Sequence, residues 1–136
     1  MLVELITTGS ELLLGEIVNE NSRYLSKELN RLGYSVVYHT TVGDNPERME
    51  QVFRTALSRA DIVITTGGLG PTQGDVTKIV GAKVMDAPLE YHPDIVEGIR
   101  QWVKEHHPSR ELTENQKRRS RYLFQRSRHR AGRSHP

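Results

Sequence analysis

The most constraining feature of this chain is the segment 61–75, in which a run of β-branched residues leads directly into a glycine-rich turn that carries a carboxylate. We expect a strand, a tight turn and then a helix, with Pro71 presetting the backbone where Thr72 and Asp75 open that helix. The turn contains three glycines whose missing Cβ atoms would let backbone N–H groups approach an anion, namely Gly67, Gly68 and Gly70. The spacing matches neither the Walker phosphate loop nor the dinucleotide fingerprint, so a tight turn with no ligand is the alternative interpretation.

Upstream of this segment, strand and helix patterns alternate. Residues 2–8 and 34–42 are rich in β-branched residues and predict strands, and residues 61–65 predict a third. A helix capped by Asn19 or Asn21 and stopped at Gly33 is expected between the first two strands, with apolar positions at Leu25, Leu29 and Leu32. A second amphipathic helix is expected over 47–60, with an apolar face of Met49, Val52, Phe53, Ala56 and Leu57. This order predicts an α/β fold, a Rossmann-like three-layer sandwich with a mostly parallel sheet and helices on both faces.

Each predicted strand ends in a small-residue turn with an acidic side chain. These turns are Gly9-Ser10-Glu11, Gly43-Asp44 and the glycine turn that leads to Asp75. The carboxyl ends of parallel strands share one edge of the sheet, and ligands bind there near the point where the strand order reverses. The three turns together therefore favour a phosphate-binding site over a purely structural role.

Three ordered motifs also resemble a known family. Residues 9–21, 42–45 and 66–72 are similar to the amino-terminal domain of the competence-damage-inducible protein A (CinA) family, which belongs to the molybdopterin-binding superfamily with MoaB, Mog and MoeA. The resemblance covers about residues 2–117. It implies an α/β domain of the molybdenum-cofactor (MoCF) biosynthesis type, which binds a phosphorylated nucleotide or pterin together with a divalent metal ion, Mg²⁺ or similar.

The resemblance also implies a chemistry and a set of site residues. The CinA branch is associated with hydrolysis of a nucleotide pyrophosphate, typically ADP-ribose to AMP and ribose 5-phosphate, and the Mog branch with adenylylation of molybdopterin. The family's acids match Asp44 and Asp75, which we expect to be catalytic and to hold the metal. The expected ligand-binding residues are Gly9, Ser10, Glu11, Gly67, Gly68, Gly70 and Thr72. A non-catalytic binding module and an inactive fragment are the alternative interpretations.

Two departures from the family pattern matter. Family members usually have two adjacent aspartates after the Gly-Pro-Thr-x motif, whereas this chain has Gly74-Asp75, which predicts a weaker metal site. The family domain also normally continues past residues 113–117 through further strands, so we expect a domain that is incomplete at its C-terminus. An incomplete sheet would have an uncovered edge, low stability and a tendency to associate.

Charge changes abruptly along the chain. Up to residue 116 there are 11 Lys and Arg against 17 Asp and Glu, whereas Lys117 onward holds 8 Lys and Arg and no acid. We therefore expect a CinA-like domain over 1–116 and a basic, disordered tail over 117–136. A nucleic-acid-binding arm, a solvated tail and an altered reading frame are the possible explanations. We favour the last and expect no nucleic-acid partner, because no recognisable binding module accompanies the basic residues.

The rest of the sequence sets general limits. The chain has no cysteine, and the sequence shows no leader and no apolar run long enough to span a bilayer, so we expect a cytoplasmic protein without a membrane partner. A homo-oligomer is possible, since related domains commonly self-associate. A helix is expected over 93–104 with a packing face of Ile95, Ile99, Trp102 and Val103. His106 and His107 suit the helix dipole better than a metal site.

Overall fold

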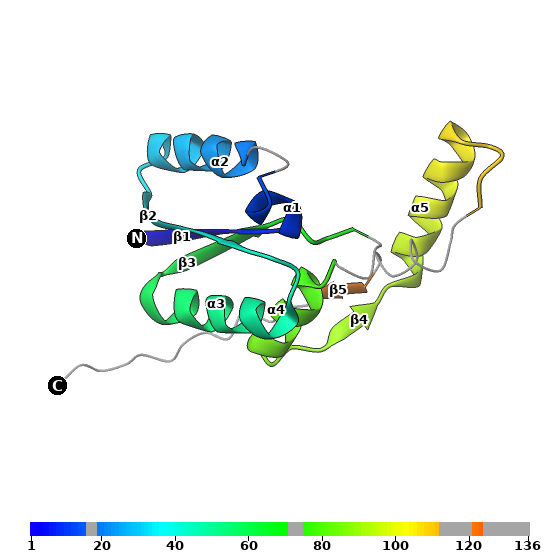
Figure 1. Ribbon diagram of the computed structural model, residues 1–136. Coiled ribbons are helices and arrows are strands. Elements are labelled where there is room, and N and C mark those ends of the chain that lie inside the picture. Colours follow the sequence, from blue (N-terminus) through cyan, green and yellow to red (C-terminus); the bar gives the residue numbers. More distant parts are fainter. Residues whose placement is uncertain (16–18, 71–74, 112–120, 124–136) are drawn as a thin grey trace.

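The computed structural model describes residues 1–15, 19–70, 75–111 and 121–123 (Figure 1). In chain order the elements are β1 (Leu2–Thr8), α1 (Ser10–Leu13), α2 (Glu20–Arg31), β2 (Ser35–Val42), α3 (Pro46–Arg59), β3 (Ile62–Thr66), α4 (Thr77–Val84), β4 (Leu89–Tyr91), α5 (Pro93–His106) and β5 (Arg121–Leu123). No helix in these ranges is long and apolar enough to cross a membrane.

The main sheet has the strand order β2-β1-β3, and both pairings are parallel. Helix α2 covers one face of the sheet and α3 the other, with α4 beside α3 (Figure 1). The chain passes from β1 to β2 on one side and then from β2 across β1 to β3 on the other, so the strand order reverses at β1. The prediction of an α/β fold with a parallel sheet and helices on both faces is confirmed.

Local sequence signals explain the two long helices that flank this sheet. The side chain of Asn19 accepts a hydrogen bond from the backbone N–H of Ser22 at 3.3 Å, so Asn19 is the N-cap of α2. Asn45 is the N-cap of α3, since its side chain accepts a hydrogen bond from the backbone N–H of Arg48 at 2.9 Å. Pro46 occupies the first turn of α3, where a backbone N–H would have no partner within the helix. Helix α2 ends one residue earlier than its apolar pattern predicts, since Leu32 is the C-cap and is exposed.

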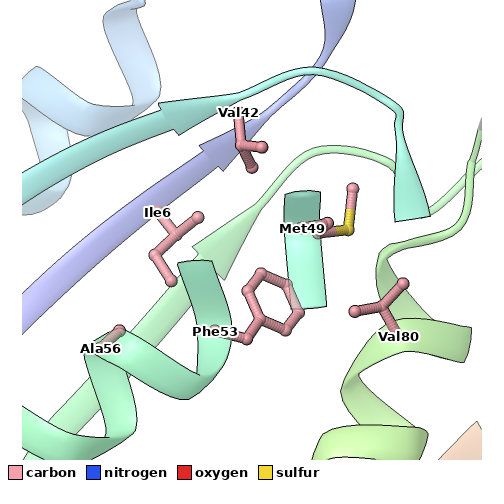
Figure 2. Packing of buried hydrophobic residues seen from close by; sticks show 6 residues of the cluster. All are labelled: Ile6, Val42, Met49, Phe53, Ala56 and Val80. Carbon is pink, nitrogen blue, oxygen red and sulfur yellow. The ribbon is translucent and has the colours of Figure 1, made fainter. Parts of the chain in front are cut away.

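The hydrophobic core lies between the sheet and the pair α3–α4. Figure 2 shows its members pointing toward one another from two strands and two helices: Ile6, Val42, Met49, Phe53, Ala56 and Val80. Met49, Phe53 and Ala56 confirm the predicted inner face of α3, whereas Leu57 at the margin of that face remains 43% exposed. The core is thus closed over β1 and more open toward β3.

An ion pair between a buried carboxylate and a partly exposed arginine joins β1 to the end of α3. Glu4 is completely buried, and Arg59 donates two hydrogen bonds of 2.8 Å to its carboxylate. Thr40 on β2 donates a third at 2.8 Å, and the Arg59 guanidinium lies 3.7 Å from the centre of the Tyr38 ring. Arg59, opposed in part by burial and aided by Thr40, holds the pKa of Glu4 below its usual range.

Polar contacts hold α2 on the opposite face of the sheet. The ring of His39 on β2 lies between two serines of α2, with Nδ1 2.8 Å from the Ser22 hydroxyl and Nε2 2.7 Å from the Ser26 hydroxyl. The Ser26 hydroxyl also donates to the carbonyl oxygen of Ser22 at 2.8 Å. These contacts fix the position of α2 along β2.

Helix α4 begins later than predicted. It starts at Thr77, so Asp75 precedes the helix, and Thr72 lies outside the described residues. The start is fixed by Thr77, whose buried hydroxyl lies 2.9 Å from the Thr8 hydroxyl. A tertiary contact of this kind overrides the local signals from which the earlier start was predicted.

Two further differences concern the C-terminal part. Helix α5 forms as predicted but projects away from the main sheet (Figure 1), and Trp102 is 54% exposed, so its assignment to a packing face is wrong. The ring of Trp102 instead stacks on His106 with centroids 4.3 Å apart.

Residues 121–123 form β5, antiparallel to β4, although no strand is predicted after Lys117. Main-chain pairing needs no side-chain periodicity, and three residues are too few to show one. The other residues of 117–136 lie outside the described ranges, so the boundary of the basic segment stays a prediction.

Candidate functional site

The carboxyl ends of β1 and β3 bear the same four residues. Ile6-Thr7-Thr8-Gly9 ends β1, and Ile64-Thr65-Thr66-Gly67 ends β3. In the parallel pairing Thr7 lies beside Thr66. The topological switch point of the sheet is therefore lined by threonine hydroxyls that are followed at once by glycine.

Helix α2 brings two amide side chains to these strand ends. Asn19 donates a hydrogen bond to the Thr7 hydroxyl at 2.9 Å, and Asn21 donates one to the Thr66 hydroxyl at 3.3 Å. The Thr7 hydroxyl in turn lies 2.9 Å from that of Thr41 on β2. The first turn of α2 is thus held over the ends of β1 and β3.

A cavity of about 270 Å³ opens between these elements. We call it the switch-point pocket, and its lining residues are Thr7, Thr8, Glu11, Leu12, Asn19, Glu20, Asn21, Thr66 and Gly67. This lining includes two carboxylates and no lysine or arginine. Hydroxyl and amide groups supply the remaining polar atoms.

The turn after β1 is joined to the turn after β2. Ser10 donates its backbone N–H to the Asp44 carboxylate at 3.4 Å, while the Asp44 N–H donates to the Ser10 hydroxyl at 3.2 Å. The N–H of Gly9 donates to the carbonyl oxygen of Val42 at 3.0 Å. Gly9, Ser10 and Asp44 therefore lie together at the predicted edge, and the Asp44 carboxylate helps to hold the turn.

Close packing explains the glycines after β3. Gly67 has a φ of 98°, and a Cβ there would lie 2.2 Å from the carbonyl oxygen of Thr8. Gly68 has a φ of 62°, and its Cβ would lie 2.2 Å from the Thr77 hydroxyl. Both positions need glycine for backbone geometry alone. Contacts within the protein therefore account for both glycines, and their geometry does not require the predicted anion.

Asp75 lies against the same turn. A Cβ on Gly70 would come within 2.6 Å of an Asp75 carboxylate oxygen, so this carboxylate covers the backbone of the turn. Within the described ranges no group of three or more His, Asp or Glu side chains could hold a metal ion. Asp75 and Asp44 are on the same edge of the fold, but neither lines the switch-point pocket.

Of the residues predicted from sequence, Glu11 and Gly67 line the pocket. Sequence reasoning missed its hydroxyl and amide groups on Thr7, Thr8, Asn19, Asn21 and Thr66. The repeated Ile-Thr-Thr-Gly tetrapeptide was the signal that could have found the threonines, although no internal repeat is apparent at longer range. The two asparagines stand in the first motif of the family resemblance, where only their capping role was considered.

Comparison with known proteins gives a consistent result. A protein-family model described as a probable molybdopterin binding domain matches residues 4–123, which is past the predicted boundary at residue 116. A CinA-like protein of Dictyoglomus thermophilum is 49% identical over 104 residues, covering 76% of this chain and 25% of the relative. A putative competence-damage inducible protein of Symbiobacterium thermophilum is 45% identical over 118 residues, covering 87% and 27%. The chain thus spans about a quarter of the length of these curated relatives.

Solved structures agree with the sequence matches. The crystal structure of the protein CinA with unknown function from Thermoplasma acidophilum is similar with a TM-score of 0.76 and 29% identity, covering 90% of this chain and 71% of that chain. The tungsten cofactor synthesizing protein MoaB from Pyrococcus furiosus is similar with a TM-score of 0.58 and 27% identity, covering 78% and 64%.

Proposed function

This chain belongs to the probable molybdopterin-binding domain family, within its CinA-like branch, and from that premise we propose that the switch-point pocket binds one part of a phosphorylated pterin or nucleotide. The observation that carries the proposal is the set of strand-end residues Thr7, Thr8, Thr66 and Gly67, which line a polar pocket where the strand order reverses. That is the place where open α/β sheets bind ligands.

The size and charge of the pocket favour the pterin, base or ribose of such a ligand over its phosphates. Its volume of about 270 Å³ is below the roughly 300–1,000 Å³ typical of pockets that enclose a whole small molecule. Glu11 and Glu20 add negative charge, so a phosphate is disfavoured there. The amino edge of a pterin or base, or the hydroxyls of a ribose, could instead donate to carboxylate and threonine oxygens. We place the phosphates outside the pocket, over the backbone of the glycine turn.

We further propose that the bound ligand is a nucleotide pyrophosphate such as ADP-ribose, and that the domain hydrolyses it. Water would attack one phosphorus, the bond from that phosphorus to the bridging oxygen would break, and AMP and ribose 5-phosphate would leave. A divalent cation, when bound, would supply charge neutralisation at the phosphates. Magnesium commonly takes one or two carboxylates together with phosphate oxygens and water, and Asp75 fits as one such ligand. Asp44 would act mainly by holding the turn, since one of its carboxylate oxygens accepts a hydrogen bond from the Ser10 N–H at 3.4 Å.

A non-catalytic binding module is the second candidate. It is favoured by the small pocket and by the absence, among the described residues, of a three-member cluster of metal-binding side chains. Binding without turnover would identify this function, and an inactive fragment would show neither.

The test combines calorimetry with product analysis. ADP-ribose, ATP and a pterin are titrated with and without Mg²⁺, and AMP release is followed for ADP-ribose. Thr66→Val removes one pocket hydroxyl, and we expect an affinity loss of about fivefold to tenfold, as for one hydrogen bond. Thr55→Val, at an exposed position of α3, is the matched control. Equal affinity of wild type and Thr66→Val would exclude the switch-point pocket as the binding site.

A further inference from the structure

A pair of buried hydroxyl groups joins the end of β1 to the start of α4. Thr8 and Thr77 are 2% and 3% exposed, and their hydroxyl oxygens lie 2.9 Å apart. The Thr8 hydroxyl also lies 3.4 Å from the carbonyl oxygen of Thr66. Among the described residues, only one direction of donation gives both hydroxyl hydrogens an acceptor. Thr77 donates to Thr8, and Thr8 donates to Thr66 at the end of β3.

The glycine turn after β3 lies directly on this pair of hydroxyls. A Cβ on Gly68 would be 2.2 Å from the Thr77 hydroxyl oxygen and 2.9 Å from that of Thr8. A Cβ on Gly67 would likewise be 2.9 Å from the Thr8 hydroxyl oxygen. Two consecutive residues of the turn thus rest on two buried oxygens. The position of these oxygens therefore sets the position of the turn backbone.

The backbone N–H groups of the turn remain available to a ligand. Among the described residues, no carbonyl oxygen accepts a hydrogen bond from the N–H groups of residues 67–70. Such N–H groups bind anions, and the missing Cβ atoms of glycine let an anion approach them closely. The neighbouring switch-point pocket instead contains the carboxylates of Glu11 and Glu20. A phosphate group therefore finds its hydrogen-bond donors on the turn and not in the pocket.

The short segment 75–77 contacts the turn at two places. Thr77 lies against Gly68, and the Asp75 carboxylate lies near Gly70, where a Cβ would be 2.6 Å from one of its oxygens. The turn is therefore held at both ends of its described part. Thr77 is the contact that also reaches the strand ends, through Thr8.

We propose that Thr77 is a positioning residue for phosphate binding. Its hydroxyl, through Thr8, holds residues 67–70 in the conformation that presents their N–H groups to a phosphate. This inference rests on the proposed function, which places the phosphates of the ligand over the turn. Thr77 is buried and does not line the switch-point pocket, whereas Thr8 does. The hydroxyl pair thus joins the pocket to the place where the phosphates bind.

The test compares a ligand with and without its phosphate. AMP and adenosine are titrated into the full chain and followed by NMR, with Mg²⁺ present because the Asp75 carboxylate would otherwise repel the phosphate. Thr77→Val keeps the shape of the side chain but replaces the hydroxyl by a larger methyl group that cannot donate to Thr8. We expect it to weaken AMP binding about fivefold to tenfold and adenosine binding less than about twofold. In the wild type, AMP and not adenosine should shift the amide resonances of residues 67–70.

A second pair of variants separates the hydroxyl from packing. Thr77→Ser and Thr77→Ala both remove the buried methyl group and differ only in the hydroxyl. Thr77→Ser should bind AMP within about twofold of the wild type, and Thr77→Ala should lose as much affinity as Thr77→Val. Equal AMP affinity of the serine and alanine variants, or equal losses for AMP and adenosine, would overturn the inference and leave the proposed function standing. A wild type that binds neither ADP-ribose nor AMP would refute the proposed function and this inference with it.

Discussion

Replacing Arg59 by methionine should invert the pH dependence that Glu4 gives to stability. Methionine keeps much of the aliphatic stem but removes both hydrogen bonds to the buried carboxylate. Breaking a buried ion pair by removing one partner generally costs about 3–5 kcal/mol. We expect about 2 kcal/mol at pH 7, between the values for a fully buried and an exposed pair, because the Arg59 side chain is 37% exposed and Thr40 still donates to Glu4.

The sign of the pH effect follows from the pKa of Glu4 in each protein. In the wild type Arg59 holds this pKa below its ordinary value of 4.5, so the stabilisation is complete above that value and is lost as the pH falls through the lowered pKa. Without Arg59, burial raises the pKa of Glu4 above its unfolded value. The carboxyl then favours folding when it is protonated, and this contribution is lost as the pH rises. The stability difference between the two proteins should therefore shrink between pH 7 and pH 4.

Urea unfolding at several pH values measures this difference. Arg54→Met is the matched control, since Arg54 lies on the same helix and pairs with the solvent-accessible Glu50. That control should change stability little, because ion pairs at the surface contribute little. A cost for Arg59→Met that equals the control, or that stays constant with pH, would refute the assignment of Glu4 as a buried, Arg59-dependent carboxylate.

Three further predictions test the turn, the cap and the proposed chemistry. Gly68→Val should lower the melting temperature, because its Cβ would clash with Thr77 at a positive φ. Gly98→Ala on α5, where nothing lies within 4 Å of the added Cβ, should raise stability by up to about 1 kcal/mol. Thermal unfolding compares the two variants. Asn19→Ala should cost about 1 kcal/mol in urea unfolding, and Asn19→Asp should recover the capping part, since an aspartate also accepts from the helix N–H. Asp75→Asn should abolish Mg²⁺-dependent AMP release with an unchanged circular dichroism spectrum, and retained turnover would remove Asp75 from the mechanism.

Much of the fold could be predicted because local and long-range signals agree. β-branched runs, Asn caps and the apolar spacing of Met49, Phe53 and Ala56 all indicate that strands alternate with helices. Because each helix then crosses over between two strands, the strands are parallel. The start of α4 could not be predicted, because it depends on a contact between Thr8 and Thr77, far apart in the sequence. Amphipathic spacing also does not show whether another element packs against a helix. For this reason the spacing in α5 wrongly predicted that Trp102 lies on a packing face.

Only the edge of the sheet that bears the switch-point pocket could be predicted. Acidic and glycine residues pointed to that edge, but the pocket itself is lined largely by threonine hydroxyls and asparagine amides. Such residues are common in strands and caps, so their chemistry becomes visible only when pairing brings Thr7 beside Thr66. The glycines, conversely, are explained by contacts within the protein.

For a neutral imidazole, the contacts of His39 determine which ring nitrogen carries the proton. The Ser26 hydroxyl hydrogen is used on the Ser22 carbonyl oxygen, so its oxygen must accept from Nε2–H. Nδ1 is then unprotonated and accepts from the Ser22 hydroxyl. The Nε2–H tautomer is thus selected by the docking of α2, and ¹⁵N chemical shifts of this one ring would show directly whether the helix is in place.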